Sequence, residues 1–284
     1  MMKKIKFSEI KDFSDLPSYI KESSDKDIKF KTKSEVIREF NNDKWSKIDQ
    51  VLTDNPEITL AKIDNQMESF SNPLTFFYEG NFYLATGKEV FEKHIKVIKE
   101  AIDPYLSDSN SIVELGAGYG SKILNLSNYN KYKNLNLFAA EYTLNGCRAI
   151  ENISKKIGKS IQVGYCDLKK NKIDGIDIPK NSIIFTSYAL HYVQNLHPSF
   201  IDFILDLKPR IVINFEPCYE LHNNDEFGYM CKRYIELNDY NKNMISIFND
   251  AQEKGKIELE IIENIIGGNP FLPISIIKWR SKNP

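Results

Sequence analysis

The feature that most constrains the fold is a glycine-rich turn between a strand-like run and a helix-like run. Residues 111–115 read Ser-Ile-Val-Glu-Leu, and Gly-Ala-Gly-Tyr-Gly follows at 116–120. Glycines allow the backbone to turn sharply and to approach a ligand closely. A helix-like stretch at 122–126 comes directly after the turn. This order predicts the beginning of an α/β domain with a ligand site at the turn.

Strand-like and helix-like segments alternate from this point onward. The expected strands are 111–115, 135–140, 161–165, 182–186 and 210–215. Helical stretches such as 145–157 and 198–207 lie between them. This alternation predicts a doubly wound, Rossmann-like α/β sheet that is parallel through these strands.

Two further strands are expected near the end of the chain. They cover 257–266 and 274–279, and the short connection at 267–270 suits an antiparallel pair. A helical insertion at about 221–255 precedes them. The expected sheet therefore has seven strands, with an antiparallel final strand.

The first hundred residues follow a different pattern. Apolar residues recur at helical spacing in 33–52 and again in 90–102. An aromatic run at 75–84 fits either a short hairpin or an irregular loop. We therefore expect two domains: a mostly helical N-terminal cap at 1–105 and a ligand-binding core at 106–284.

Composition excludes several classes of function. The net charge is −1, so the protein as a whole does not attract nucleic acid. Arginine is the residue best suited to contacts with base edges, and the chain has only 5 arginines beside 33 lysines. No nucleic-acid partner is therefore expected. No apolar run is long enough to span a membrane, and no signal peptide is evident. The four cysteines form no CxxC pair, so neither a disulfide framework nor a metal site is expected. These features predict a cytoplasmic protein that does not bind membranes.

Acidic residues end three successive strands of the expected sheet. They are Glu114, Glu141 and Asp167. Glu141 comes 23 residues after Gly118, where a carboxylate can accept hydrogen bonds from both hydroxyls of a ribose. A carboxylate beside the glycine turn, such as Glu114, is compatible with a cationic ligand and unfavourable for phosphates.

The run Val-Glu-Leu-Gly-Ala-Gly-Tyr-Gly at 113–120 resembles motif I of the class I S-adenosyl-L-methionine (SAM)-dependent methyltransferases. A dinucleotide loop would place its third glycine one residue later, and a nucleotide P-loop would need Gly-Lys-Ser/Thr. The resemblance covers about 111–215 and the two closing strands. It implies SAM as the cofactor and S-adenosyl-L-homocysteine (SAH) as its product. The implied cofactor-binding residues are Glu114, Gly116, Ala117, Gly118, Glu141, Tyr142, Asp167, Leu168 and Tyr188.

Two titratable residues follow the fourth and fifth strands, whose ends face the expected cofactor. An imidazole such as His191 can take a proton near neutral pH, and Glu216 ends an apolar strand. Either is a candidate catalytic base or an orienting group for the methyl acceptor, and either can instead be structural. Candidate acceptor-binding residues are Tyr83, Tyr192, His222 and Arg233.

These observations predict methyl transfer to oxygen or nitrogen of a small metabolite, a sugar or a peptide-like natural product. The chain lacks the Asn/Asp-Pro-Pro-aromatic sequence that, in the family it resembles, marks methylation of amide or exocyclic nitrogens. The alternatives are a protein or peptide methyltransferase and a catalytically inactive SAM-binding regulatory scaffold. The oligomeric state is not predicted.

Overall fold

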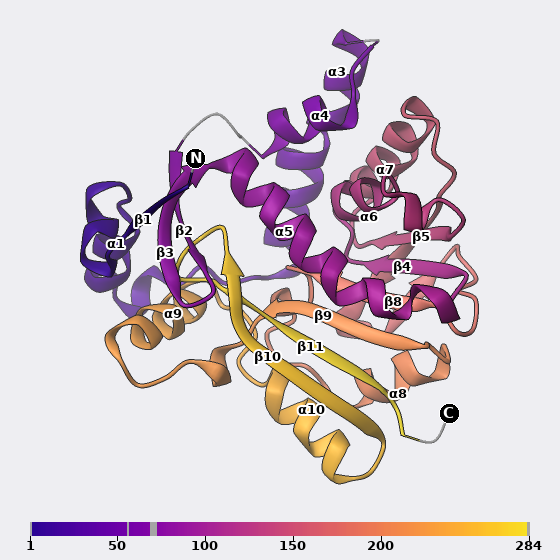
Figure 1. Cartoon of the computed structure of the whole chain (residues 1–284). Coiled ribbons are helices and arrows are strands. Elements are labelled where there is room, and N and C mark those ends of the chain that lie inside the picture. The colour runs from indigo at the N-terminus through magenta and orange to yellow at the C-terminus, as the bar shows by residue number, and fades with distance from the viewer. Residues whose placement is uncertain (1, 56, 69–72, 283–284) are drawn as a thin grey trace.

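The computed structural model describes residues 2–55, 57–68 and 73–282. Within these residues, one sheet contains eleven strands (Figure 1). The strands are β1 (Lys3–Ile5), β2 (Pro73–Tyr78), β3 (Asn81–Thr86), β4 (Ser111–Leu115), β5 (Asn136–Glu141), β6 (Gln162–Asp167), β7 (Lys172–Asp174), β8 (Ile183–Ser187), β9 (Ile211–Pro217), β10 (Ile257–Gly267) and β11 (Ile274–Ser281). Their order across the sheet is β1-β3-β2-β10-β11-β9-β8-β4-β5-β6-β7.

The centre of the sheet has the expected doubly wound arrangement. β6, β5, β4, β8 and β9 are neighbours in parallel pairs, and β11 pairs antiparallel with both β9 and β10. The α/β class is therefore confirmed. The expected count of seven strands was wrong, because β7 extends one edge of the sheet and β1, β2 and β3 extend the other.

Helices cover both faces of the sheet. The α-helices are α1 (Leu16–Glu22), α2 (Lys33–Val36), α3 (Lys47–Asp54), α4 (Leu60–Met67), α5 (Gly87–Ile102), α6 (Ser121–Leu126), α7 (Leu144–Lys156), α8 (Ser199–Asp206), α9 (Glu226–Leu237) and α10 (Met244–Glu253). A π-helix, η3 (Ile37–Trp45), continues α2. The short 3₁₀ segments are η1 (Phe7–Asp12), η2 (Asp25–Asp27), η4 (Asp103–Asp108), η5 (Asn130–Tyr132), η6 (Leu168–Lys170), η7 (Leu190–Tyr192) and η8 (Tyr219–Leu221).

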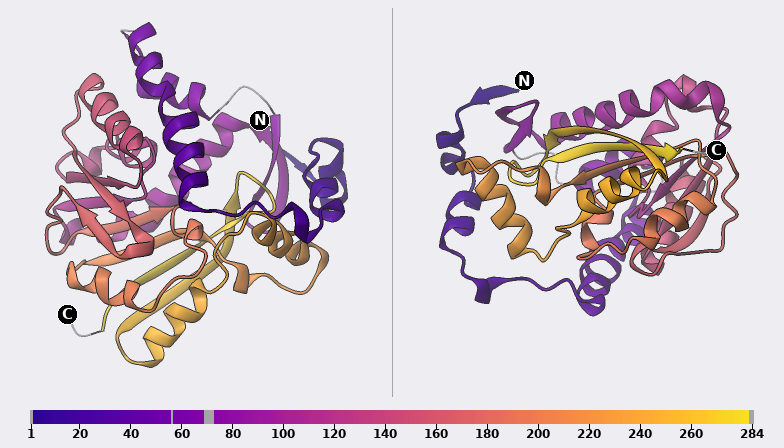
Figure 2. Two further views of the ribbon diagram at one scale, coloured as in Figure 1. Left: turned by 180° about the vertical axis from the view of Figure 1, so that it is seen from behind. Right: turned by 90° about the horizontal axis from the view of Figure 1, so that it is seen from below.

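Alternating side chains of the central strands fill two separate cores. In β4, Ile112 packs into the core beneath α5, α6 and α7, whereas Val113 packs into the core beneath α8 and α10. Successive residues of a strand point to opposite faces, so a strand buried on both faces is apolar throughout. The view from below in Figure 2 shows magenta α5 on one side of the sheet and golden α10 on the other.

The N-terminal segment is less helical than expected, because it contributes three strands to the same sheet. Residues 75–84 form a hairpin, in agreement with one of the two alternatives. Glu79 and Gly80 have φ values of 45° and 76°, the left-handed conformations that two-residue hairpin turns require. The hairpin joins the sheet where Tyr78 pairs with Ile266 of β10. This segment therefore extends the sheet beside α5 as well as supplying helices (Figure 1).

Every helix among the described residues is too short or too polar to cross a bilayer.

Candidate active site

A cavity of about 470 Å³ lies at the carboxyl ends of the parallel strands. Its size is within the range of pockets that bind small molecules and cofactors. All nine residues that the sequence assigned to a cofactor line it: Glu114, Gly116, Ala117, Gly118, Glu141, Tyr142, Asp167, Leu168 and Tyr188. They come from the ends of β4, β5, β6 and β8, so the sheet topology brings these distant segments of the chain to one wall.

The glycine loop follows β4, and two of its glycines, Gly116 and Gly118, line the cavity. Gly116 and Gly118 have φ values of 72° and 58°, which L side chains rarely adopt. A Cβ on Gly116 would overlap the Cβ of Ala189, and a Cβ on Gly118 would lie 3.1 Å from Trp45 Cζ2. The loop is tied to β5 because Ala140 O accepts the Gly116 N–H at 2.8 Å. The backbone of the loop is thus both fixed in place and accessible to a ligand at close range.

Glu141 ends β5 and forms part of the cavity wall. Its Oε2 accepts the Gly118 N–H at 3.0 Å, and its Oε1 accepts the Thr143 N–H at 3.0 Å and the Thr143 hydroxyl at 2.8 Å. Burial raises the pKa of Glu141, and these hydrogen bonds oppose that rise. The carboxyl group is therefore held in one orientation against the glycine loop.

Glu114 is the second-to-last residue of β4 and is almost fully buried. Its Oε2 accepts the Ile123 N–H at 3.0 Å, near the beginning of α6. Burial raises the pKa of Glu114 to about 8, while the nearby Lys122 acts to lower it. Burial therefore favours the neutral carboxyl group and reduces the negative charge that the sequence suggested beside the glycine loop.

Asp167 ends β6 and caps the short turn that follows it. Its Oδ1 accepts the Lys170 N–H at 3.2 Å, which places the adjoining Leu168 on the cavity wall. Tyr142 reaches the same wall, with its ring 5.9 Å from that of Tyr165. Leu168 and Tyr142 thus line this part of the cavity beside the Asp167 carboxylate.

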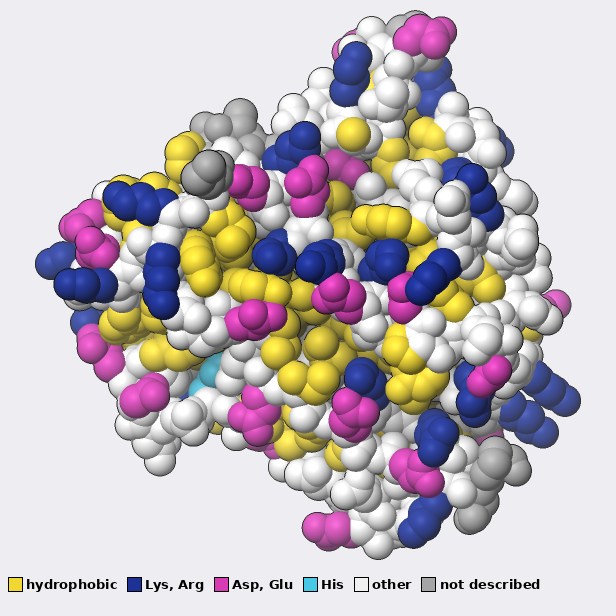
Figure 3. All heavy atoms as spheres, viewed as in Figure 1, with side chains coloured by type: hydrophobic (Ala, Val, Ile, Leu, Met, Phe, Trp, Pro, Cys, Tyr) yellow, Lys and Arg dark blue, Asp and Glu magenta, His cyan; other side chains and the backbone are white. Residues whose placement is uncertain are grey.

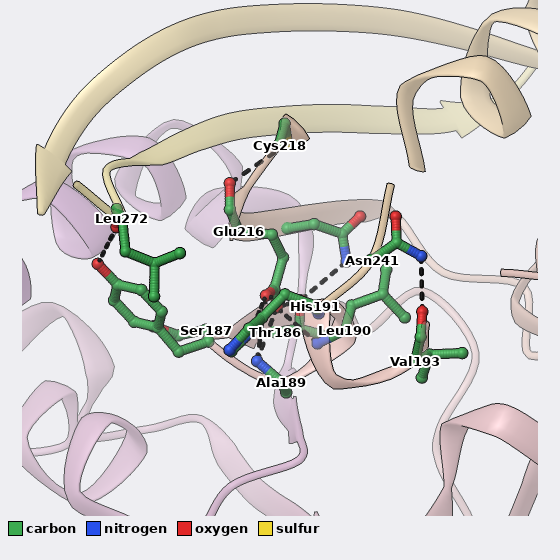
Figure 4. Close-up of polar contacts among 12 residues, drawn as sticks. Thr186, Ser187, Ala189, Leu190, His191, Val193, Glu216, Cys218, Asn241 and Leu272 are labelled. Atoms are coloured by element: carbon green, nitrogen blue, oxygen red, sulfur yellow. Dashed lines mark hydrogen bonds and ion pairs between the residues drawn. The ribbon is translucent and has the colours of Figure 1, made fainter. Parts of the chain in front are cut away.

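The structure does not bring the two candidate bases to the cavity wall. The Glu216 side chain is fully buried, and His191 is only 2% exposed. The Glu216 carboxylate accepts the backbone N–H groups of Ala189, Leu190 and His191 at 3.0–3.2 Å and the Thr186 hydroxyl at 2.7 Å (Figure 4). It thus anchors the loop after β8.

His191 belongs to the same buried arrangement. Its Nδ1 lies 3.2 Å from Glu216 Oε2, and its ring packs 4.1 Å from that of Tyr192 and 4.6 Å from that of Tyr240. The imidazole is thus packed against the Glu216 carboxylate and two aromatic rings and is not among the residues that line the cavity. The sequence suggested a base here because His191 follows the end of a strand. Position next to a strand end does not determine the direction in which a side chain points.

The loop that Glu216 anchors is strained. Tyr188 has a φ of 52°, an unfavourable conformation for a bulky residue. Its hydroxyl donates to Leu272 O at 3.0 Å, and its ring lines the cavity. The carboxylate of Glu216 and this hydroxyl together hold the strained loop against the glycine loop.

The four residues proposed from the sequence for the acceptor lie in different places. Tyr192 lines the cavity and packs 5.2 Å from the ring of Phe40. Tyr83 packs on Phe76 within the β2–β3 hairpin, away from the cavity wall. His222 is buried near Phe227, and burial lowers its pKa to about 4.

Arg233 is engaged elsewhere. Its guanidinium pairs with Asp25 at 2.9 Å and with Glu236 at 3.3 Å, and it donates to Ser23 O. It therefore ties α9 to the N-terminal segment and does not reach the cavity as an anion clamp.

Sequence reasoning did not identify the individual residues of the N-terminal segment that form part of the wall. The cavity is also lined by Lys31, Lys33, Val36, Phe40, Trp45 and Glu68. The Trp45 ring lies 5.2 Å from that of Tyr119, and Asn41 joins this segment to α7 through two hydrogen bonds with Asn145. Helical spacing indicated a helix here, but no local motif indicated which cavity it would line.

Among the described residues, no group of three or more His, Cys, Asp or Glu side chains is arranged to hold a metal ion.

Comparison with known proteins identifies the fold. No protein-family profile and no curated protein sequence matches the chain. The small RNA methyltransferase HEN1 is similar in structure with a TM-score of 0.50 and 14% identity, over 71% of this chain and 28% of that one. This chain thus spans little more than a quarter of the length of that protein.

Two further solved structures are similar at lower TM-scores. PigF with SAH has a TM-score of 0.45 and 14% identity over 94% of this chain and 70% of that one. Magnesium protoporphyrin IX methyltransferase (ChlM) from Synechocystis PCC 6803 with bound SAH has a TM-score of 0.47 and 12% identity over 69% of this chain and 87% of that one. Together with the sheet topology and the glycine loop, the similarity to HEN1 shows that this chain has the fold of the class I SAM-dependent methyltransferases.

Proposed function

We propose that the chain is a SAM-dependent methyltransferase that acts on oxygen or nitrogen of a small molecule. The observation that carries the proposal is the common cavity of the nine residues expected to bind the cofactor. They reach that cavity from the ends of four strands and from the glycine loop. The fold supports the same activity.

The residues present fit SAM. The buried carboxyl group of Glu141 stands beside the loop, where it would accept hydrogen bonds from ribose hydroxyls. The backbone of the loop at Gly116 and Gly118 would receive the amino-acid part of the cofactor at close range. The apolar wall at Leu168, with Asp167 at its edge, would receive the adenine. When bound, SAM supplies an electrophilic methyl group; the protein orients the acceptor and excludes water.

The charge distribution supports a small acceptor over a nucleic acid. The net charge is −1. On the face shown in Figure 3, Lys and Arg side chains are interspersed with acidic and hydrophobic ones. Binding along a phosphate backbone depends on clustered Lys and Arg. A peptide methyltransferase and a SAM-binding scaffold without turnover would have the same cofactor site. The experiment below distinguishes them from a small-molecule methyltransferase.

The proposal is tested by calorimetry with SAH, SAM, NAD and ATP on the full chain. SAH and SAM should bind with one site per chain, and NAD and ATP should not bind. Incubation with methyl-labelled SAM and fractions of a metabolite extract should then label a small-molecule fraction. Absence of SAH binding would overturn the proposal, and SAH binding with no labelled acceptor in any fraction would favour the scaffold.

A further inference from the structure

A second cavity of about 310 Å³ adjoins the first. Glu68, Lys122 and Tyr188 line both, so the two cavities meet at these side chains. The remaining wall is formed by Leu74, Gly87, Val90, Phe91, His94, Ile266, Gly268 and Asn269. They belong to β2, α5, the end of β10 and the connection to β11, and none of these eight residues was assigned to a site from the sequence. Only the folded sheet extension creates this space.

His94 lies on α5 at the boundary between the cavities. Its Nε2 is 3.3 Å from the Oγ of Ser187, which lines the first cavity. Its ring also packs edge-on against Tyr188, with 5.6 Å between ring centroids. The imidazole and the serine hydroxyl thus form a polar pair at the point where a molecule in the second cavity would face one in the first.

This histidine is neutral under physiological conditions. Burial lowers the pKa of His94 to about 3, and the positive charge of Lys122 acts in the same direction. A neutral imidazole keeps one nitrogen as a hydrogen-bond acceptor. Together with the Ser187 hydroxyl, it can both accept from and donate to a hydroxyl group.

The rest of the wall favours a neutral, mostly apolar ligand. Leu74, Val90 and Ile266 are apolar. The two charges of the wall lie at the boundary, where Lys122 Nζ is 4.0 Å from a Glu68 carboxylate oxygen and offsets its charge. A space of about 310 Å³ accommodates a one- or two-ring molecule.

We propose that the second cavity binds the methyl acceptor, and that this acceptor is a small, neutral, largely apolar molecule whose hydroxyl group is held by His94 and Ser187. The inference rests on the proposed function, since the first cavity must hold the cofactor. It narrows the reaction to methylation of oxygen. It also places His94, a residue of α5 that precedes the glycine loop in the sequence, in contact with the acceptor.

The test uses 4-ethylphenol as the probe and 4-ethyltoluene as its analogue without the hydroxyl group. Both are titrated into the SAH-saturated full chain, with calorimetry and NMR of ring-labelled histidines as readouts. The chain has four histidines, so the spectrum is simple, and exposed His197 serves as the internal control. The phenol should shift the His94 signal and leave that of His197 unchanged. It should bind about fivefold more tightly than the toluene, as expected for one net hydrogen bond.

Two variants separate the hydroxyl contact from the cavity itself. His94→Phe keeps a ring of similar size but removes the acceptor nitrogen, so the preference for the phenol should disappear. Gly268→Leu should fill the cavity and weaken both probes at least tenfold. A Cβ on Gly268 would meet only Val90 Cγ1, at 3.6 Å, so the added side chain has room to enter without displacing the backbone. Both variants should bind SAH within twofold of the wild-type affinity.

Equal affinity of wild type for the two probes, or a preference that survives in His94→Phe, would overturn the role of His94. Equal binding of the phenol to wild type and Gly268→Leu, or no binding to either, would overturn the assignment of the cavity. The SAH titration is read separately: its failure would overturn the proposed function, and the same probe titrations on the SAH-free chain would still test the cavity.

Discussion

Replacing Glu216 distinguishes a catalytic base from a residue that anchors a loop. The Glu216 carboxylate accepts three backbone N–H groups: the buried ones of Leu190 and His191, and the partly buried one of Ala189. A buried donor left without a partner costs roughly 1–3 kcal/mol. In Glu216→Ala all three lose their acceptor, and the two buried donors alone should lower the free energy of unfolding by about 2–6 kcal/mol, a large part of the 5–15 kcal/mol typical of a folded protein.

Glu216→Gln is the milder change. The remaining amide oxygen can occupy the place of Oε1, which accepts from Thr186, Ala189 and Leu190. The amide NH₂ group then faces the His191 N–H, which loses its acceptor. One unsatisfied donor predicts a loss of about 1–3 kcal/mol. Because the loosened loop lines the first cavity, SAH affinity should fall as well.

The assay is urea denaturation followed by circular dichroism, with SAH calorimetry on the same samples. Glu253→Gln is the matched control, because Glu253 is exposed on α10 and its replacement should change stability by less than about 0.5 kcal/mol. The reasoning would be refuted if Glu216→Gln kept wild-type stability and SAH affinity while turnover with the true acceptor fell by about 10²–10⁴-fold, the range typical of a lost general base.

Three further predictions concern the cofactor site. Gly118→Val should abolish SAH binding in calorimetry, because the valine side chain would meet Trp45. Gly158→Val is the control: Gly158 also has a positive φ but lies in open space, so this variant should bind SAH normally. Equal loss of binding in both variants would indicate a general folding defect. Glu141→Ala should weaken SAH binding by roughly 5- to 150-fold, because ribose hydroxyls left without an acceptor cost about 1–3 kcal/mol. The effect on kcat at saturating SAM should be smaller, and a wild-type Kd for SAH would contradict the role of Glu141. Folding raises the pKa of Glu114 from 4.5 to about 8, so between these values the folded protein holds a proton that the unfolded chain has released. The stability that this proton provides should therefore be lost as the pH rises from about 5 to 8, by up to about 1.4 kcal/mol per pH unit. Urea denaturation of Glu114→Gln across this range should show a flatter dependence than wild type, and parallel curves would show that Glu114 titrates normally.

Sequence alone determined the parts of the protein whose signals are local. The run at 111–120 specifies a strand, a sharp turn and a helix through neighbouring residues, and β-branched periodicity specifies the strands that follow. Parallel strands end at one edge of a sheet, so Glu141 and Asp167 could be placed beside the glycine loop before any coordinates were known.

Only the tertiary structure decided which distant segments meet there. Tyr78 pairs with Ile266, a residue far away in the sequence. This pairing makes the aromatic run at 75–84 an extension of the sheet, beside which the second cavity forms. The direction of a side chain at a strand end depends on what packs around it, so Glu216 turned inward to buried N–H groups while His94, from a helix without a motif, came to lie beside Ser187. Contacts of this kind arise from packing between segments far apart in sequence, and no local pattern of residues encodes them.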